Sequence, residues 1–145
     1  MIYTPMTKLA LITAFKAHEG QTDRSGLPYI FHPYHLAEQM TNETETAAAL
    51  LHDVIEDTDM TADDLRSAGI SEEIITVVTL LTHEEGTDYF DYVRRLKDNP
   101  AARAVKLADL AHNSDTTRLD TVTQHDLDRL EKYKRARRII LGEED

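Results

Sequence analysis

The stretch from Ala47 to Ile55 is the feature that most constrains the fold, because its side chains are apolar nearly all round a helix. A helix of this kind is buried at the centre of a domain and does not lie on its surface. Elsewhere the apolar residues recur mostly at helical spacing, and no run of alternating β-branched residues lies between turns. We therefore predict an all-α fold, a bundle of helices around a central one.

The spacing predicts eight helices separated by polar or Gly/Pro-rich segments. We expect them at residues 7–18, 33–40, 47–55, 61–69, 72–81, 88–96, 100–113 and 126–141. Thr44 or Thr46 is a candidate cap for the central helix. Thr61 and Asp64 have the spacing of a capping box, and Gly69 is expected to end the helix that they open. Residues 19–31 contain two glycines and a proline and are predicted to form a loop.

Length and charge narrow the function. A chain of 145 residues predicts a single domain over residues 1–145. The absence of cysteine excludes a disulfide scaffold, a thiolate metal site and a cysteine nucleophile. The net charge of −11 argues against a surface for duplex DNA or anionic lipid, but it is compatible with one small anionic ligand beside a bound cation. No apolar run is long enough to cross a membrane and no secretory signal opens the chain, so we expect a cytoplasmic protein.

The central helix ends in an unusual cluster of ionisable residues, His52, Asp53, Glu56 and Asp57. If the helix is continuous, His52 shares a face with Glu56, and Asp53 shares a face with Asp57. Nitrogen and oxygen donors that converge in this way suit a divalent metal. The cluster therefore predicts a metal site at this end of the helix.

Two further polar residues in apolar segments, His32 and Asp109, are candidates to complete the ligand set. Four protein ligands would leave coordination positions open for water and substrate, as in a catalytic site. Each residue also has a simpler interpretation. His32 could cap a helix, and Asp109 could pair with Lys106 or Arg103. Glu56 and Asp57 could be a solvated helix end.

Several ordered motifs resemble the hydrolase domain of the RelA/SpoT family, a branch of the HD-superfamily phosphohydrolases. They are Ala17–Gln21, Arg24–Tyr29, His32-Pro33, Ala48–Thr58, Val105–Asp109 and His112-Asn113. Together they span roughly residues 8–118. The resemblance implies the all-helical HD fold. It also implies hydrolysis of guanosine tetra- or pentaphosphate, in which pyrophosphate leaves the 3′ position and GDP or GTP remains.

The resemblance also implies roles for individual residues. The positions that match the manganese ligands are His32, His52, Asp53 and Asp109. The acidic pair that positions or activates the attacking water matches Glu56 and Asp57. The loop that borders the guanosine matches Arg24, Ser25, Gly26 and Tyr29, with Arg24 packing on the base. The polar residues that reach the nucleoside match Asn113 and Thr116. One manganese ion per chain and a guanine nucleotide are therefore the expected cofactor and ligand.

The sequence departs from the family pattern in three places. No synthetase domain follows, so the chain is expected to be similar to the stand-alone small alarmone hydrolases. Residues 82–99 are shorter than the corresponding family segment, and Leu110 replaces a basic residue. These differences leave open an HD phosphohydrolase of another nucleotide, a non-catalytic nucleotide-binding regulator, or a helical interaction module. The acidic pair Glu56-Asp57 argues against the regulator, because a protein that only binds has little use for two carboxylates facing a phosphate.

Overall fold

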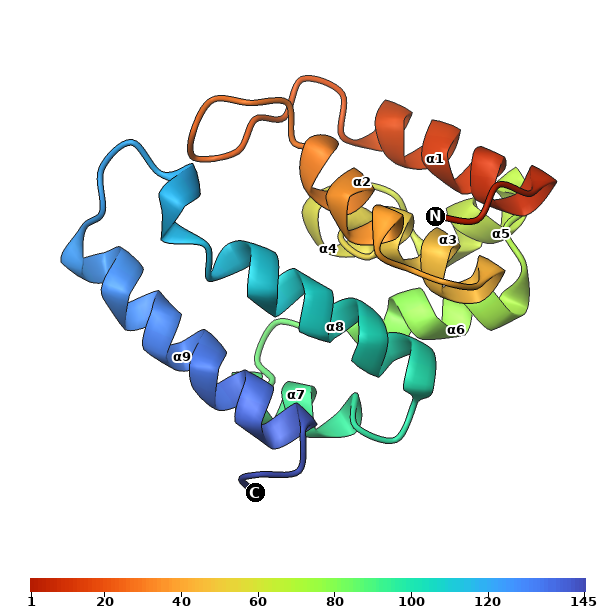
Figure 1. Ribbon diagram of the computed structural model, residues 1–145. Helices are drawn as coiled ribbons and strands as arrows, with labels where there is room; N and C mark the ends of the chain where they lie inside the picture. Colours follow the sequence, from red (N-terminus) through yellow and green to blue (C-terminus); the bar gives the residue numbers. More distant parts are fainter.

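The chain folds entirely into helices, as the computed structural model of residues 1–145 shows (Figure 1). The helices are α1 (Pro5–Ala17), α2 (Phe31–Glu38), α3 (Glu43–Leu51), α4 (Val54–Asp57), α5 (Ala62–Ala68), α6 (Glu72–Leu81), α7 (Tyr89–Arg95), α8 (Pro100–Asn113), the 3-10 helix η1 (Thr116–Arg118) and α9 (Gln124–Ile140). The only strand-like pairing is a single bridge between Thr22 and Pro28. The predicted all-α class is confirmed.

Helix α3 is the centre of the core, as its composition predicts. All five residues from Ala47 to Leu51 are completely inaccessible to solvent. Helices α1, α2, α6 and α8 pack around α3, and α9 packs against α8 and α7 (Figure 1). A helix without a polar face has to be covered on all sides, and this arrangement provides that cover.

The start of α3 differs from the prediction. Asn42 caps the helix, because its side chain accepts a hydrogen bond from the Glu45 backbone N–H at 2.8 Å. Thr46 is buried inside the first turns and its hydroxyl donates to the Asn42 carbonyl at 2.7 Å. The extended backbone of Asn42 starts the helix before either predicted threonine. The capping box of Thr61 and Asp64 at the start of α5 is confirmed.

The predicted continuous helix over residues 47–55 is also wrong. Helix α3 ends at Leu51, His52 follows it, and Asp53 leaves helical geometry with φ −106° and ψ 1° before α4 begins. His52 and Glu56 therefore do not lie on one face of a continuous helix, as the sequence predicted. Helix α2 begins at Phe31, two residues earlier than predicted, and so includes His32 in its first turn.

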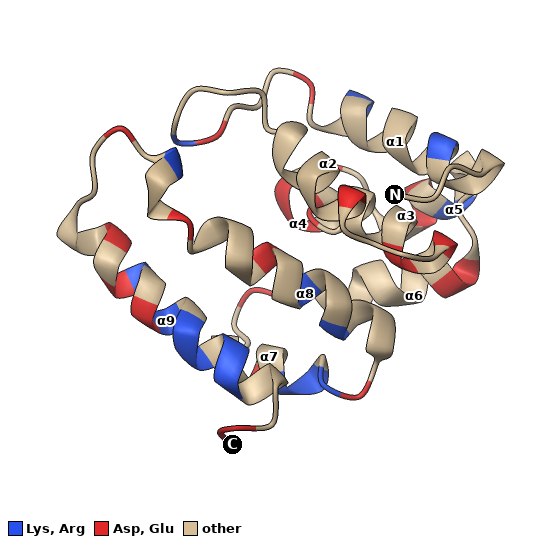
Figure 2. Cartoon of the chain, viewed as in Figure 1, with Lys and Arg blue, Asp and Glu red and all other residues tan.

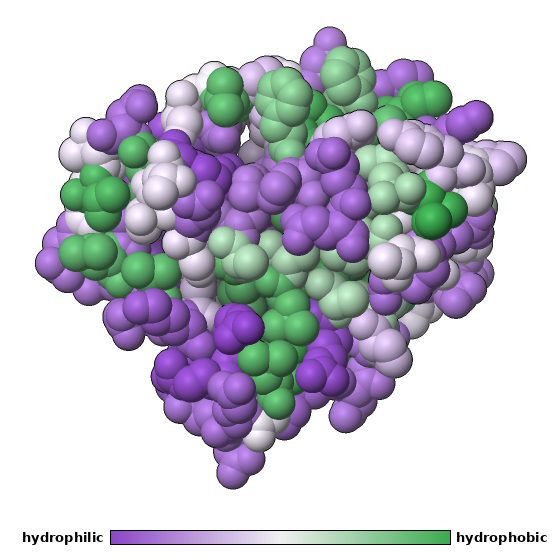
Figure 3. Space-filling model, viewed as in Figure 1, coloured by the Kyte–Doolittle hydropathy of each residue, from purple (hydrophilic) through white to green (hydrophobic).

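Charge is distributed unevenly over the surface. Figure 2 shows Lys and Arg gathered along the C-terminal half of α9, whereas acidic side chains are spread over most other elements. Polar side chains cover much of the face seen in Figure 3, with apolar patches between them. None of the helices is both long and apolar enough to cross a lipid bilayer.

Candidate functional site

Three buried side chains from different helices converge on one point. His32 comes from the first turn of α2, His52 follows α3, and Asp109 lies on α8. One donor atom from each lies within 4.8 Å of the others. Asp109 Oδ1 is 2.9 Å from His32 Nε2 and 3.6 Å from His52 Nε2. The structure thus brings together three of the four predicted metal ligands in a cluster that a divalent ion could occupy.

The hydrogen bonding of His52 fits a metal ligand. Its Nδ1 lies 2.7 Å from the Ala49 carbonyl oxygen, to which only an Nδ1–H can donate. In the neutral ring the buried Nε2 then carries a lone pair, and no hydrogen-bond donor reaches it. It instead faces Asp53 Oδ2 at 3.0 Å. A lone pair and a carboxylate this close need a proton or a cation between them.

The electrostatics of His52 point in the same direction. Burial favours the neutral ring, yet Asp53 and Asp109 outweigh it and raise the pKa of His52 well above its usual value. This position therefore strongly favours positive charge. A divalent ion held by the imidazole and the two carboxylates would supply that charge without a proton.

Asp109 is held from both sides. Lys106 Nζ donates to its Oδ2 at 2.9 Å, and the Asn113 amide donates to its Oδ1 at the same distance. Burial opposes ionisation, but Lys106 and the two histidines keep the pKa of Asp109 well below its usual range. The carboxylate is thus fixed in its charged form, with Oδ1 facing the histidines. Of the two predicted alternative partners, Lys106 is the one that pairs with it.

A second group of carboxylates lies beside the first. Oxygen atoms of Asp53, Glu56 and Asp57 lie within 4.8 Å of one another. The Tyr29 hydroxyl donates to Asp53, and Glu56 Oε1 accepts the backbone N–H of His83 at 2.7 Å. Asp57 receives no such hydrogen bond. Burial first, and then repulsion from the other two carboxylates, raises its pKa to about 6. Such a carboxyl group is suited to accept a proton near neutral pH.

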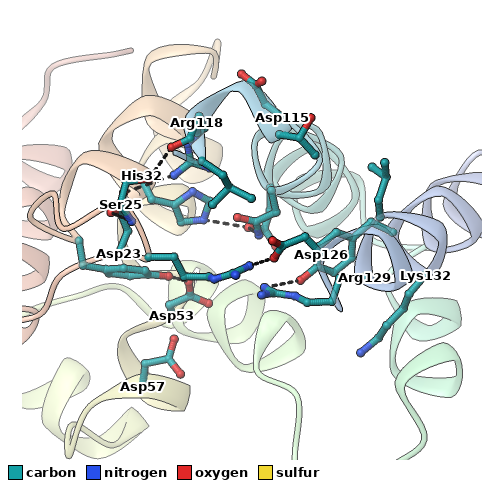
Figure 4. Close-up of a pocket in the computed structure, with 18 of the residues that line it drawn as sticks. Asp23, Ser25, His32, Asp53, Asp57, Asp115, Arg118, Asp126, Arg129 and Lys132 are labelled. Carbon is teal, nitrogen blue, oxygen red and sulfur yellow. Dashed lines mark hydrogen bonds and ion pairs between the residues drawn. The ribbon is translucent and has the colours of Figure 1, made fainter. Parts of the chain in front are cut away.

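A cavity of about 490 Å³ opens beside these groups (Figure 4). The predicted ligands His32, Asp53 and Asp109 line it, whereas His52 lies behind them. The other predicted site residues in its wall are Arg24, Ser25, Tyr29, Glu56, Asp57, Asn113 and Thr116. Gly26 does not line the cavity. It has a φ of +83° and turns the loop that carries its neighbours.

The loop over residues 21–30 is attached to the segment between α8 and α9. Arg24 forms an ion pair with Asp126, and the Ser25 hydroxyl donates to the Arg118 carbonyl. The Arg118 guanidinium lies 3.6 Å from Asp23. Figure 4 shows these side chains meeting across the cavity. Arg24, which is predicted to pack on the base, therefore already pairs with Asp126 through its guanidinium group. About half of its side chain stays exposed.

Sequence reasoning did not find partners for two histidines that reach the site. The Nε2–H of His83 donates to the Thr87 carbonyl oxygen at 2.6 Å, and its backbone N–H donates to Glu56. His112 Nδ1 lies 2.7 Å from His32 Nδ1. Burial, His32 and Arg118 lower the pKa of His112 to about 4, so its ring is neutral near pH 7. A signal for His112 was available, because it lies three residues after Asp109 on one helix.

The all-α fold, with a His/Asp cluster at the centre of the bundle, defines an HD-type domain with a candidate metal centre. No protein-family model matches the chain. The bifunctional (p)ppGpp synthase/hydrolase SpoT of Escherichia coli is 35% identical over 129 residues, which cover 74% of this chain and 17% of that protein. A guanosine-3′,5′-bis(diphosphate) 3′-pyrophosphohydrolase of Vibrio cholerae is 55% identical over 58 residues, 37% of this chain and 8% of that protein.

A solved structure agrees with the fold. It is described as a metazoan ortholog of SpoT that hydrolyzes ppGpp and plays a role in starvation responses. The two structures superpose with a TM-score of 0.77 at 23% identity, over 99% of this chain and 90% of the other. The chain is a RelA/SpoT-type HD domain. It spans less than a fifth of the length of these curated relatives.

Proposed function

We propose that this protein hydrolyses the 3′-diphosphate of guanosine tetra- or pentaphosphate and releases pyrophosphate with GDP or GTP. The observation that carries the proposal is the buried, unpartnered His52 Nε2, which faces two carboxylates beside a cavity wide enough for a small ligand. The names of the bacterial relatives and of the structural neighbour support the choice of substrate.

We assign the divalent ion to His32, His52, Asp53 and Asp109, and propose manganese as that ion. Mixed nitrogen and oxygen donors suit such an ion. When bound, it would act as a Lewis acid that offsets phosphate charge and makes a nearby water more acidic. Tyr29 holds Asp53, while Lys106 and Asn113 hold Asp109, so these carboxylates are oriented before any ligand binds.

Asp57 is proposed to accept the proton of the attacking water, because its raised pKa suits this role. Glu56, fixed by the His83 N–H, is proposed to position that water. The water oxygen bonds to the phosphorus attached to the 3′-oxygen. The bond from this phosphorus to the 3′-oxygen then breaks, and the 3′-oxygen takes up a proton as pyrophosphate leaves.

The nucleoside is proposed to lie along the loop of Arg24, Ser25 and Tyr29, close to Asn113 and Thr116. The cavity wall formed by α9 adds Arg129 and Lys132, and neither has a carboxylate within 4 Å. Figure 4 shows both side chains on the α9 side of the cavity, where Arg129 Nη2 donates to the Tyr133 hydroxyl at 3.1 Å. Four of the seven carboxylates in the wall thus lie at the metal end, and the two cations without a carboxylate partner lie at the α9 side. A ligand with phosphates at both ends, such as a 3′,5′-bisphosphorylated nucleoside, matches this distribution.

The decisive experiment measures pyrophosphate release from a panel of purine nucleotides with added Mn²⁺. We expect release from guanosine tetra- and pentaphosphate, and loss of both activity and bound metal in the His52→Ala variant. Glu131→Gln, on the exposed face of α9, is the matched control and should behave as wild type. Turnover of a different nucleotide would identify another HD phosphohydrolase. Tight nucleotide binding without turnover would identify a regulator.

The net charge of −11 supports a further proposal, that neither nucleic acid nor an anionic membrane is a partner of this domain. Localisation in the cytoplasm stays a prediction from the sequence.

A further inference from the structure

His112 and His32 lie edge to edge. Their Nδ1 atoms are 2.7 Å apart, the ring centroids are 5.0 Å apart, and the ring planes differ by only 6°. If the two rings were stacked face to face with their centroids 5.0 Å apart, their Nδ1 atoms could not come as close as 2.7 Å. An imidazole nitrogen lies about 1.1 Å from its ring centre, so two coplanar rings with facing nitrogens account for both distances. The contact is therefore an N–H···N hydrogen bond, in which one ring donates and the other accepts.

The direction of this hydrogen bond follows from the other nitrogen of His32. Its Nε2 faces Asp109 Oδ1 at 2.9 Å, inside the proposed ligand cluster. Without an ion, Nε2 carries the proton that this carboxylate oxygen accepts; when a cation takes the place of that proton at Nε2, the ring keeps its proton on Nδ1. The Nδ1–H of His32 then points at His112, and His112 Nδ1 has to be the acceptor.

We propose that His112 is a positioning residue for the metal centre: it accepts the Nδ1–H of His32 and so directs the Nε2 lone pair of His32 at the bound ion. This inference rests on the proposed metal site. Partners of this kind, which fix the tautomer and orientation of a ligating histidine, typically change metal affinity about 10- to 100-fold when removed.

The surroundings of His112 hold its ring in place. Arg118 Nη1 donates to its backbone carbonyl at 2.9 Å. The ring of His35 packs against it at 4.3 Å between centroids and forms no hydrogen bond with His32. His35 therefore contacts the same ring without sharing the proposed role, which makes it a matched control.

The experiment compares the His112→Phe, His112→Asn and His35→Phe variants with wild type. Phenylalanine keeps a planar ring but has no acceptor, whereas the Asn side-chain oxygen can lie close to the position of Nδ1 and accept the same hydrogen bond. Calorimetric titration of the full chain gives Mn²⁺ affinity. Chemical denaturation of the metal-free variants measures whether each is folded. Histidine ¹⁵N spectra of the protein loaded with diamagnetic Zn²⁺ report which His32 nitrogen carries the proton.

We expect His112→Phe to weaken Mn²⁺ binding about 10- to 100-fold and to abolish the hydrogen-bonded Nδ1–H signal of His32. His112→Asn should restore most of the affinity and the signal, and His35→Phe should leave both unchanged. The inference is wrong if His112→Phe binds Mn²⁺ like wild type. It is also wrong if the Phe and Asn variants lose affinity equally, or if His35→Phe loses as much. If wild type binds no divalent ion, the proposed metal site fails first and this inference fails with it.

Discussion

Asp57 and Glu56 are neighbours with the same functional group, but their surroundings give them different chemistry. The Glu56 carboxylate accepts the His83 N–H, whereas the Asp57 carboxylate receives no hydrogen bond and lies beside two other carboxylates. Its pKa of about 6 compares with about 3.9 for an ordinary aspartate. Of the two residues, Asp57 is therefore the one whose surroundings give it a pKa suited to a general base.

This difference predicts a titration. In metal-free protein the Asp57 carboxyl group should titrate with a midpoint of about 6, measured from its ¹³C resonance. The Asp53→Asn variant should lower this midpoint, because it removes a repelling charge. A bound divalent cation should also lower it.

The same group sets an acid limit on activity. Only the carboxylate form accepts a proton, so kcat should fall as the pH drops through the pKa of Asp57 in the loaded enzyme, at or below about 6. Asp57→Asn should lower kcat on the order of 10²- to 10⁴-fold while Mn²⁺ still binds. A near wild-type kcat for this variant, measured with metal content, would remove Asp57 from the reaction.

The His/Asp cluster that could hold a metal ion was largely predictable from the sequence, whereas the residues that orient it were not. His32, His52 and Asp109 stand out because each is a polar residue in an apolar segment, which needs a partner. The two-histidine contact of His32 and His112 joins residues 80 positions apart. Nothing in local spacing predicts which nitrogen faces which, since this depends on how α2 packs on α8.

At the scale of elements, local signals predicted the starts of α5 and α8 correctly, from Thr61 and from Asn99-Pro100. The starts of α1 and α2 lie two residues earlier than predicted. The break after α3 has a different origin. His52 donates to the Ala49 carbonyl, and Tyr29, which lies 24 residues away, holds Asp53. These contacts stabilise a non-helical Asp53 that helical periodicity cannot anticipate. The 3-10 helix η1 was not predicted either, because three residues are too few to show a helical periodicity.

The loop of residues 21–30 and the start of α9 meet through Arg24 and Asp126, and this contact refines the expected role of Arg24. The guanidinium edge pairs with Asp126, which leaves a flat face for a base. Arg24→Ala should raise KM roughly tenfold, equivalent to about 1.4 kcal/mol, with little change in kcat. Steady-state kinetics measure both.

The Arg24→Lys variant tests whether Arg24 acts by stacking on the base or by holding the loop to Asp126. Lysine keeps the charge that pairs with Asp126 but lacks the flat guanidinium, so KM should rise almost as much as in the alanine variant. Asp126→Asn removes the ion pair but keeps one oxygen that can accept the Thr123 backbone N–H in the capping box of α9, so it should have a smaller effect. If the lysine variant restores the wild-type KM, Arg24 acts by holding the loop and does not stack on the base.

Helix α5 provides a stability prediction away from the site. Gly69 ends this helix with φ +105°, and an added Cβ would lie 3.3 Å from Leu9 Cδ2. Gly69→Ala should lower the free energy of unfolding by about 1–2 kcal/mol, as measured by urea denaturation. Gly20→Ala is the control, since Gly20 has φ +82° with no atom within 4 Å of the added Cβ. It should cost only the backbone strain, and an equal loss in both variants would show that the Leu9 contact contributes nothing.

At the scale of the whole molecule, an acidic protein is proposed to bind an acidic ligand. The cavity does not resolve this conflict by itself. Its wall contains five Lys and Arg side chains and seven Asp and Glu side chains, which gives a net charge of −2. One divalent cation brings this charge to zero. The ion would therefore be needed for binding as well as for chemistry, even for a ligand that does not touch it.

GDP and guanosine test this electrostatic role, because neither has a 3′-phosphate to contact the ion. A divalent ion about 10 Å from a diphosphate contributes on the order of 1.4 kcal/mol after partial screening by salt. Removing the metal with EDTA should thus weaken GDP binding about tenfold in a calorimetric titration, whereas guanosine binding should not change. Lys132→Gln should weaken GDP binding in the same selective way, because the ammonium group of Lys132 lines the cavity, packs over the Tyr89 ring and has no carboxylate partner. An equal loss of guanosine affinity on metal removal would indicate that the ion shapes the cavity, and the charge argument would then be wrong.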